Sequence, residues 1–285
     1  MNIAQQIVDG VSVAGTLLLM TLGLAITFGV MKIINLAHGE LIMVGAYTTY
    51  VVTSQWHLPF AVSVVCAFAV TALIGALMEW LVIRRLYGRP METLLATFGI
   101  SILLQQIVRL IFGATNKPIE SPISGTLAIG EIVIPYLRLF MIAFALALLA
   151  VTALILYKTK FGMLVRTVSQ NRKMSECLGI NTTRIDLLTF AWGAGLTGTA
   201  GAVLSPLRNV APTMGVDYMI DSFMTIVLGG VGSLPGTIAG SAIMGEASQL
   251  LTYFGGETGA KIIVFLIVIV LIRFKPEGLI KMESR

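Results

Sequence analysis

Polar and ionisable side chains interrupt the apolar stretches of this chain at a few positions. Asn35, His38 and Glu40 form the densest group, and Asp221 and Glu246 stand on either side of a glycine-rich stretch further along. Such side chains can exchange hydrogen bonds and charge with a polar solute. A charge at the centre of a membrane helix costs about 2.5–3.5 kcal/mol on insertion scales, so these residues are candidates for function by default. We interpret all five as lining a solute pathway or gate.

The alternative is structural: in a helix break, Asn35, His38 and Glu40 can satisfy one another and the freed backbone groups. Catalysis is not indicated, because His38-Gly39-Glu40 lacks the two-histidine spacing of a helix-borne zinc site and the only other histidine is His57. In the glycine-rich stretch at 229–236, no Lys follows the glycines as it does in a phosphate-binding loop. We expect no catalytic residue, no metal and no cofactor on this chain. ATP, if it is used, is bound by partner chains.

The elements that carry these residues must lie in a membrane. Hydrophobic residues make up 56% of the chain, charged residues only 12%, and the mean hydropathy is +0.92. Soluble domains are about 45–50% apolar and about 25% charged. Too little polar surface remains for a soluble enzyme or a nucleic-acid-binding protein, and two cysteines, Cys66 and Cys177, cannot form a disulfide framework.

We predict an all-α bundle, a single transmembrane domain over residues 1–285 with about 8–9 membrane segments of about 20 residues each. The apolar segments fall at roughly 11–31, 36–54, 59–83, 93–112, 136–157, 186–206, 219–230, 236–254 and 259–274.

A glycine-rich stretch separates two of these segments. It contains Gly229, Gly230, Gly232, Pro235 and Gly236, which cannot continue a helix. In a bilayer, non-helical backbone survives only where protein or water satisfies its polar groups. We therefore predict a broken or re-entrant helix pair inside the bundle, and we count these residues with the pathway or gate.

Basic residues gather in three connections that alternate helices place on one side of the membrane. Thirteen of the 19 Lys and Arg residues fall there: Arg84, Arg85, Arg89, Lys158, Lys160, Arg166, Arg172, Lys173, Arg184, Arg273, Lys275, Lys281 and Arg285. The opposite connections hold Arg109, Lys117, Arg138, Arg208 and Lys261. Because cytoplasmic loops carry the excess of Lys and Arg, we predict the N-terminus outside and the C-terminus in the cytoplasm.

The longest predicted cytoplasmic stretch covers about residues 158–185. Its apolar residues, among them Val165, Val168 and Leu178, recur at near-helical spacing, and Gly179 is placed to end a helix. That pattern predicts a short amphipathic helix beneath the membrane, available to dock on a partner chain. The other interpretation is a solvated basic loop on anionic lipid.

Five stretches carry a family resemblance. They are GVMKIINLAHGELIMVGAYTTY (29–50), LYGRPMETLLATFGISILLQQIVRLIFGATN (86–116), GMLVRTVSQNRKMSECLGI (162–180), YMIDSFMTIVLGGVGSLPGT (218–237) and KPEGL (275–279). In this order they resemble the inner-membrane permeases of ABC importers of the branched-chain amino acid and urea type. The resemblance implies a multi-pass permease domain in the bacterial inner membrane that works by alternating access.

The resemblance also implies partners. These are a second, related permease, two cytoplasmic ATPases that bind the ATP, and an extracytoplasmic solute-binding protein, with the lipid bilayer around them and no nucleic acid. Residues 162–180 match the family's coupling segment, which docks in a cleft of an ATPase. Arg166, Asn171, Glu176 and Gly179 are carried over as ATPase-coupling positions.

Two stretches bear on the cargo. Residues 87–106 and 209–224 are more similar to the urea permeases of this family than to its leucine permeases, so we expect urea or a related short-chain amide. Branched-chain amino acids are the alternative. A zwitterion would be better served by paired charges, which only the ionisable candidates above could offer. A passive urea or water channel is a third alternative, under which the large basic segment would have no role.

Overall fold

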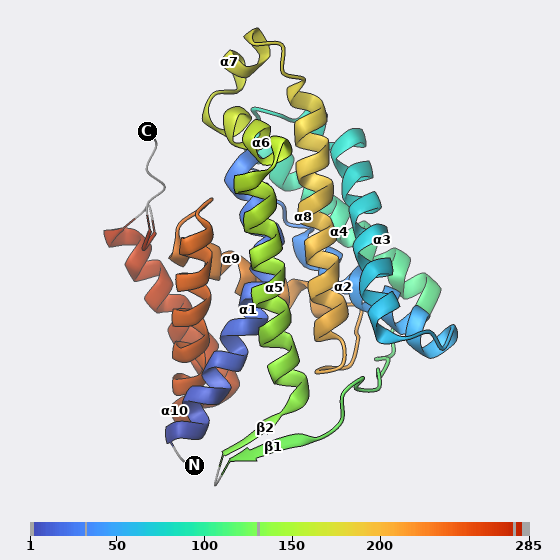
Figure 1. The fold of residues 1–285 in the computed structure, drawn as a ribbon, viewed down its shortest axis with the longest axis vertical. Helices are drawn as coiled ribbons and strands as arrows, with labels where there is room; N and C mark the ends of the chain where they lie inside the picture. Colours follow the sequence, from blue (N-terminus) through green and yellow to red (C-terminus); the bar gives the residue numbers. More distant parts are fainter. Residues whose placement is uncertain (1–2, 32, 130–131, 276–277, 281–285) are drawn as a thin grey trace.

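The fold is that of a computed structural model, which describes residues 3–31, 33–129, 132–275 and 278–280. Helices account for most of these residues (Figure 1). In chain order they are α1 (Ile3–Met31), α2 (His38–Tyr50), η1 (Val51–Gln55), α3 (Phe60–Leu81), η2 (Ile83–Arg85), α4 (Pro90–Phe112), α5 (Tyr136–Lys158), α6 (Lys160–Gln170), α7 (Arg172–Cys177), α8 (Thr182–Leu204), α9 (Met214–Gly229) and α10 (Leu234–Phe274). The long helices coincide with the apolar segments expected from the sequence.

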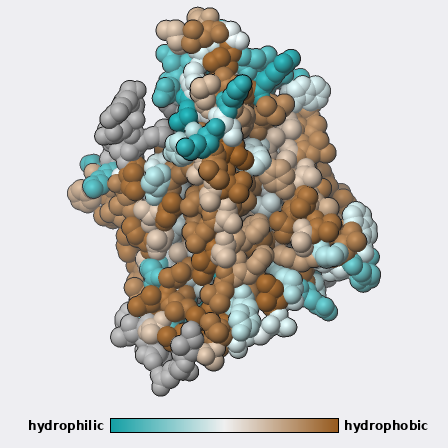
Figure 2. All heavy atoms as spheres, viewed as in Figure 1, coloured by the Kyte–Doolittle hydropathy of each residue, from teal (hydrophilic) through white to brown (hydrophobic). Residues whose placement is uncertain are grey.

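α1 and α8 form the centre of the bundle, whereas α3, α4 and α5 lie at its periphery. In the most apolar window of each helix, 67% of α1 and 78% of α8 are buried, against 22% of α3 and 17% of α4 and of α5. Large side chains such as Leu95 and Leu110 of α4 point outward. Figure 2 shows hydrophobic residues covering the side of the bundle, with hydrophilic residues gathered mainly at the end that carries α6 and α7. This is the surface that a bilayer requires.

Five described helices are long and apolar enough to cross a membrane, or six if the bent pair α9–α10 counts as one span. α2 is not among them, because its 13 residues rise only about 20 Å at ~1.5 Å per residue. α10 changes direction at Gly256, whose φ of 69° is non-helical. The eight to nine segments inferred from apolar runs include these shorter pieces, and that count stays a prediction.

The predicted break at the glycine-rich stretch is confirmed as a sharp bend. Met214–Gly229 and Leu234–Thr252 meet at 117° across a break of at most four residues. Gly230 and Gly232 have φ values of 107° and 82°, a region that side chains with a Cβ rarely adopt. Ser233 then caps α10, because its Oγ accepts a hydrogen bond from the Gly236 amide at 3.1 Å. Whether the pair spans the membrane or re-enters it stays open.

Close contact between helix backbones holds the centre together. An added Cβ on Gly201 of α8 would overlap the carbonyl oxygen of Ile42 in α2, and one on Gly45 would overlap the carbonyl oxygen of Gly198. A Cβ on Gly23 of α1 would meet Thr197 of α8. Small residues allow this approach in membrane bundles, as the glycine spacing of α8 predicts.

One end of the bundle is defined by α6 and α7. The Oγ of Ser169 donates a hydrogen bond to the Gly29 carbonyl oxygen at 3.4 Å, which places the end of α1 there. The amide of Leu279 donates to the Leu228 carbonyl oxygen at 2.9 Å, so the last described residues meet the end of α9. We call this the α6 end. Its location in the cytoplasm stays a prediction.

A short β-hairpin lies at the opposite end, and the all-α prediction did not include it. β1 (Thr126–Ile129) pairs antiparallel with β2 (Ile132–Pro135), with Thr126 opposite Pro135. The side-chain amide of Gln5 in α1 fastens it, since its Nε2 donates to the Val133 carbonyl at 3.2 Å and its Oε1 accepts from the Val133 amide at 3.0 Å. We call this the hairpin end.

Candidate functional site

Of the predicted pathway residues, Asn35 lies in the non-helical turn before α2 and His38 is the first residue of α2, and both are buried. Asn35 closes the turn, because its Oδ1 accepts a hydrogen bond from the Ala37 amide at 3.0 Å. The His38 ring bridges two central helices. Its Nε2 lies 2.9 Å from the Met20 carbonyl oxygen, and its Nδ1 lies 3.4 Å from the Oγ1 of Thr197. In this state both ring nitrogens of His38 have protein partners.

Glu40 follows in the first turn of α2 and is 1% exposed. Its Oε1 accepts hydrogen bonds from Ser101 at 3.1 Å and from Gln105 at 2.7 Å, both on α4. Its Oε2 has no hydrogen-bond partner among the described residues, and it lies against Gly215 at the start of α9. A helix N-terminus carries partial positive charge, which favours a carboxylate at this point.

The first turns of α2 and α9 therefore pack against each other inside the bundle. An added Cβ on Gly39 of α2 would overlap the carbonyl oxygen of Gly215 in α9. His38 joins this crossing to α1 and α8, and Glu40 joins it to α4. Their role in a pathway stays a prediction.

A cavity of about 430 Å³ lies elsewhere, between α1, α5, α8, α9 and α10. Of the pathway candidates, only Asp221 is among its lining residues. Three cations join it: Arg138 at the start of α5, Arg208 just after α8, and Lys261 in α10. All three belong to the small set of cations assigned to the predicted outer connections. The cavity therefore gathers charge of both signs toward the hairpin end.

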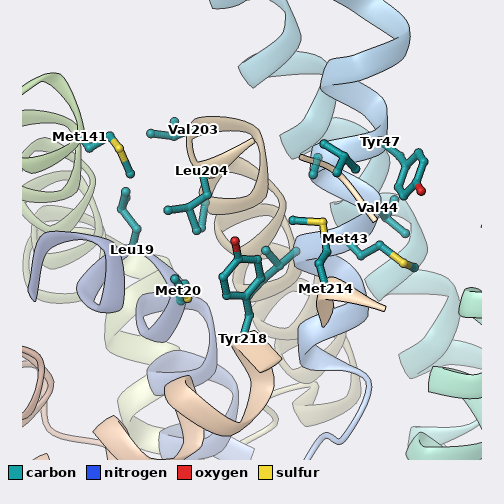
Figure 3. Packing of buried hydrophobic residues seen from close by; sticks show 14 of the residues in the cluster. Leu19, Met20, Met43, Val44, Tyr47, Met141, Val203, Leu204, Met214 and Tyr218 are labelled. Carbon is teal, nitrogen blue, oxygen red and sulfur yellow. The ribbon is translucent and has the colours of Figure 1, made fainter. Parts of the chain in front are cut away.

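Two ion pairs involve charges that line the cavity. The Nζ of Lys261 lies 3.7 Å from the Oδ2 of Asp221, and these two side chains are 46% and 30% exposed. Arg138 forms an ion pair with Asp9 of α1. Large apolar and aromatic side chains also line the cavity. Figure 3 shows Met20, Leu204 and Tyr218 converging from α1, α8 and α9, and all three line the cavity.

The glycine break and Glu246 lie outside this cavity's lining. Gly229 and Gly236 pack backbone against backbone, and Gly232 packs against Gly29 of α1. The Glu246 carboxyl group lies against Gly10, also on α1. These contacts give Gly229, Gly232 and Gly236 a role in the bend itself, and Pro235 lies in the first turn of α10. Their part in gating stays a prediction.

The predicted amphipathic helix at residues 158–185 forms two helices, α6 and α7. Val165 and Val168 are buried as expected, whereas Leu178 is 70% exposed. The chain breaks at Asn171, whose Oδ1 caps α7 by accepting from the Met174 amide at 3.0 Å. A polar side chain at this point offers the backbone an alternative to one continuous helix.

Gly179 ends α7 as the sequence predicts. Its φ is 80°, its amide donates to the Glu176 carbonyl at 3.0 Å, and the Ile180 amide donates to the Ser175 carbonyl at 3.0 Å. This pair of bonds is a Schellman motif. Arg166 lies over the Tyr157 ring at 5.4 Å. ATPase docking by Arg166, Asn171, Glu176 and Gly179 stays a prediction.

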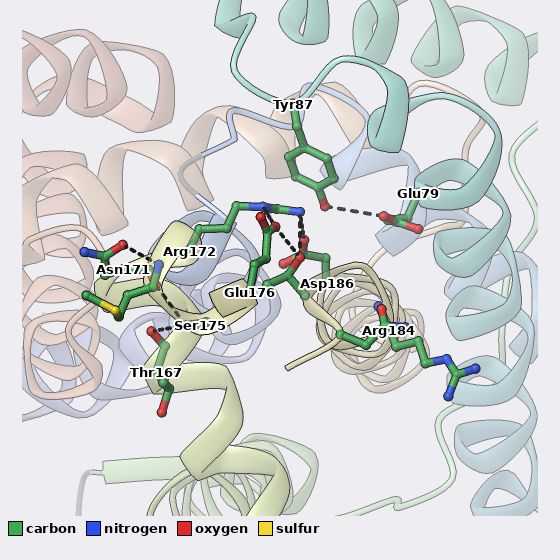
Figure 4. A network of polar contacts seen from close by, with 12 residues as sticks. Glu79, Tyr87, Thr167, Asn171, Arg172, Ser175, Glu176, Arg184 and Asp186 are labelled. Atoms are coloured by element: carbon green, nitrogen blue, oxygen red, sulfur yellow. Dashed lines mark hydrogen bonds and ion pairs between the residues drawn. The ribbon is translucent and has the colours of Figure 1, made fainter. Parts of the chain in front are cut away.

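A polar network behind α7 was not predicted (Figure 4). An Nη of Arg172 lies 2.7 Å from the Oδ2 of Asp186, whose side chain is 1% exposed. The guanidinium group also covers the Tyr87 ring at 4.4 Å, and its Nε lies 3.5 Å from Glu176. The Tyr87 hydroxyl donates to the Oε1 of Glu79 at 3.4 Å. Arg172 therefore joins α7 to α8, α3 and the loop before α4.

The Tyr87 hydroxyl is held in its neutral form. Burial raises the pKa of Tyr87 above its usual range, and the nearby carboxylates of Asp186 and Glu79 add to the effect. A neutral phenol can donate to Glu79, whereas a phenolate would repel it.

Comparison with known proteins places the chain in a family. Residues 6–273 match the family described as the permease component of the branched-chain amino acid transport system. The chain belongs to this family. It is therefore a permease component of an ABC importer and a multi-pass protein of the inner membrane.

Individual permeases match along nearly the whole chain. BraD of Pseudomonas aeruginosa, a permease protein of a high-affinity branched-chain amino acid transport system, is 28% identical over 97% of this chain and 95% of its own length. LivH of Salmonella typhimurium, named for the same kind of system, is 29% identical over 97% of this chain and 94% of its own. The ribose import permease RbsC of Bacillus subtilis is 32% identical, but over 41% of this chain.

Arg172, Lys261 and Asp186 of this permease escaped the sequence reasoning. Arg172 and Lys261 were counted only as loop cations, although they lie opposite Asp186 and Asp221. A signal was available for Asp186, since an acidic residue at the edge of an apolar helix needs a partner. The partner's identity depends on the fold.

Proposed function

We propose that this permease carries branched-chain amino acids across the membrane as one subunit of an ATP-driven importer. The observation behind this cargo is the match to branched-chain amino acid permeases along 97% of the chain. The cavity supports it, because Asp221 and the three cations offer opposite charges to a zwitterion while Met20 and Leu204 offer an apolar wall. A passive channel needs neither feature.

In the proposed mechanism, a solute-binding protein delivers the amino acid at the hairpin end and two ATPases act at the α6 end, with a second permease beside this one. ATP-driven closure of the ATPases moves α6 and α7, with Arg166, Asn171, Glu176 and Gly179 near the contact. Arg172 passes the movement to α8 through Asp186 and toward α3 through Tyr87 and Glu79. The bundle then alternates between outward-open and inward-open states.

Urea is a second candidate cargo. It rests on residues 87–106 and 209–224, which resemble urea permeases more than leucine permeases. Urea is neutral and needs hydrogen-bonding groups without strong fixed charge. The Asp221–Lys261 pair in the cavity is a feature that urea would not require.

The test is uptake of labelled leucine and labelled urea, each at micromolar concentration, in cells that lack this chain and in complemented cells. We expect the deletion to abolish leucine uptake, complementation to restore it, and ATP depletion to stop it. Loss and rescue of urea uptake alone would move the cargo to the second candidate and leave the permease mechanism standing. Uptake that survives ATP depletion would contradict that mechanism.

A further inference from the structure

We propose that the cavity between α1, α5, α8, α9 and α10 is a binding site for the zwitterionic end of an amino acid. Asp221 would receive the ammonium group, and Lys261 would receive the carboxylate, with Arg208 and Arg138 adding positive charge to the cavity lining. This inference deepens the proposed function and rests on it. It names the residues that would recognise the cargo inside the permease.

The charges argue for a ligand because they are costly where they stand. Asp221 lies within α9, one arm of a bent pair apolar enough to count as a membrane span. Ionisable residues at such places face cavities or partners and mark substrate paths. Lys261 partners Asp221 at 3.7 Å, beyond the 2.7–2.9 Å of a strong charge-assisted hydrogen bond.

The remaining exposure of the pair points into the cavity. Both side chains line it, and they are 30% and 46% exposed. An amino acid lying alongside the pair would place its ammonium group beside the Asp221 carboxylate and its carboxylate beside the Lys261 ammonium group, so that every charge gains an opposite neighbour. A neutral solute offers no such exchange.

The rest of the cavity suits a branched aliphatic side chain. Its volume of about 430 Å³ falls within the range of roughly 300–1,000 Å³ of small-molecule sites. Val13, Leu17 and Met20 of α1, together with Leu204 of α8 and Met244 of α10, supply an apolar surface. Ser248 and Gln249 add polar groups near the charged wall. This combination of a largely apolar wall and few polar groups is typical of ligand sites.

The position fits the direction of import. α5 begins at the hairpin end, where Arg138 lies, and the cavity also reaches Leu207, just beyond the end of α8. Its lining in α1 runs from Ser12 to Met20, and the end of that helix near α6 takes no part. If the positive-inside prediction holds, the cavity lies toward the side from which a binding protein delivers cargo.

The experiment measures ligand binding to the full chain in lipid nanodiscs by saturation-transfer NMR. The probes are leucine, 3-methylbutylamine, which lacks the carboxylate, and 4-methylpentanoate, which lacks the ammonium group. We expect leucine to bind at least tenfold more tightly than either analogue. Urea at equal concentration should not displace it.

Two variants assign the ends of the ligand. Asp221→Asn should weaken leucine binding about tenfold and abolish its advantage over 4-methylpentanoate. Lys261→Gln should abolish its advantage over 3-methylbutylamine instead. Asp217→Asn is the matched control, because Asp217 lies one turn earlier on α9, is exposed and is absent from the cavity lining. Its binding should match that of the unaltered chain.

A charge swap separates binding from folding. Asp221→Lys combined with Lys261→Asp keeps an ion pair, so the chain should still fold. The swap exchanges the positions of the positive and negative groups, so leucine no longer fits in its original orientation and its binding should stay weak. Recovery of full leucine affinity in the swap would reduce the pair to a structural role. Equal affinity for leucine and its analogues in the unaltered chain, displacement by urea, or no leucine binding would overturn the site.

The uptake assay distinguishes this failure from that of the proposed function. If leucine uptake depends on the chain but Asp221→Asn leaves its KM unchanged, the cavity site is wrong and the cargo is right. If uptake of urea alone depends on the chain, the cargo itself is wrong.

Discussion

Two ion pairs of this permease, one at the α6 end and one in the cavity, differ in their surroundings. Arg172 and Asp186, at the α6 end, are 2.7 Å apart, and the Asp186 side chain is 1% exposed. Asp221 and Lys261, in the cavity, are 3.7 Å apart and remain 30% and 46% exposed. In the first pair the carboxylate is enclosed, and the Arg172 side chain, 37% exposed, lies over the Tyr87 ring. The second faces an open volume.

The difference separates a mechanical connection from a recognition site. A short, enclosed pair satisfies its charges within the protein, and removing one partner strands the other in a poorly solvated place. A long, partly exposed pair contributes little to folding but keeps bonding capacity for a ligand. The comparison predicts that variants at the two ends will fail in different ways.

Arg172→Leu should have the largest effect on stability. The substitution leaves the Asp186 carboxylate without its cation, and we expect the free energy of unfolding to fall by about 3 kcal/mol. This is the low end for a broken buried ion pair, because Arg172 is itself partly exposed. Thermal unfolding in detergent, followed by tryptophan fluorescence, measures it. Arg172→Leu combined with Asp186→Asn should recover most of the loss. A single variant as stable as the unaltered chain would erase the contrast between the two ends.

Asp221→Asn should reverse this pattern, with little effect on folding and a clear effect on transport. An exposed pair is worth about 0–1 kcal/mol, so the unfolding temperature should stay nearly unchanged. The KM for leucine uptake should rise about tenfold, which corresponds to roughly 1.4 kcal/mol of lost binding. A large drop in unfolding temperature with an unchanged KM would instead make the cavity pair structural.

Sequence patterns predicted the elements better than the contacts between them. Apolar runs predicted the long helices, and the glycines and Pro235 predicted the bend, because both depend on local preferences. Gly179 was also predicted, since a Schellman motif is local. The hairpin was missed although only two residues separate Thr126–Ile129 from Ile132–Pro135 in the sequence, a spacing typical of β-hairpins.

The candidate site was predicted only in part for a physical reason. Asp221 meets Lys261 because α10 changes direction at Gly256, and Arg172 meets Tyr87 because α7 folds back over the loop before α4. Such pairings depend on tertiary geometry. His38 and Glu40 stood out in the sequence as buried polar residues, but the residues that satisfy them lie on α1, α4 and α8.

Tyr87→Phe tests the enclosed end through pH. Burial raises the pKa of Tyr87 in the folded state, so the unfolded chain loses this proton first and stability falls as pH rises through about 10 and above. The phenylalanine variant should lose less stability between pH 9 and pH 11 than the unaltered chain. Unfolding temperatures across that range measure it, with Tyr157→Phe as the control. Identical pH profiles for Tyr87→Phe and the unaltered chain would show that Tyr87 is solvated.

Glu176→Gln should have the smallest effect on stability and separates two roles of α7. Glu176 lies 3.5 Å from Arg172 in an i,i+4 pair with both side chains partly exposed, and it accepts a hydrogen bond from Thr182 at 2.8 Å. A glutamine keeps that hydrogen bond, so we expect a stability loss of about 0.5 kcal/mol or less.

Transport by the same variant decides which surface of α7 matters. If Glu176 contacts an ATPase, Glu176→Gln should lower ATP-driven uptake while the unfolding temperature holds, and Lys173→Gln, at an exposed position on the same helix, provides the comparison. If Glu176 only supports Arg172, uptake should follow the small change in stability. Because Asp186 already holds Arg172 at 2.7 Å, loss of uptake without loss of stability would indicate a contact between Glu176 and a partner chain rather than support of Arg172.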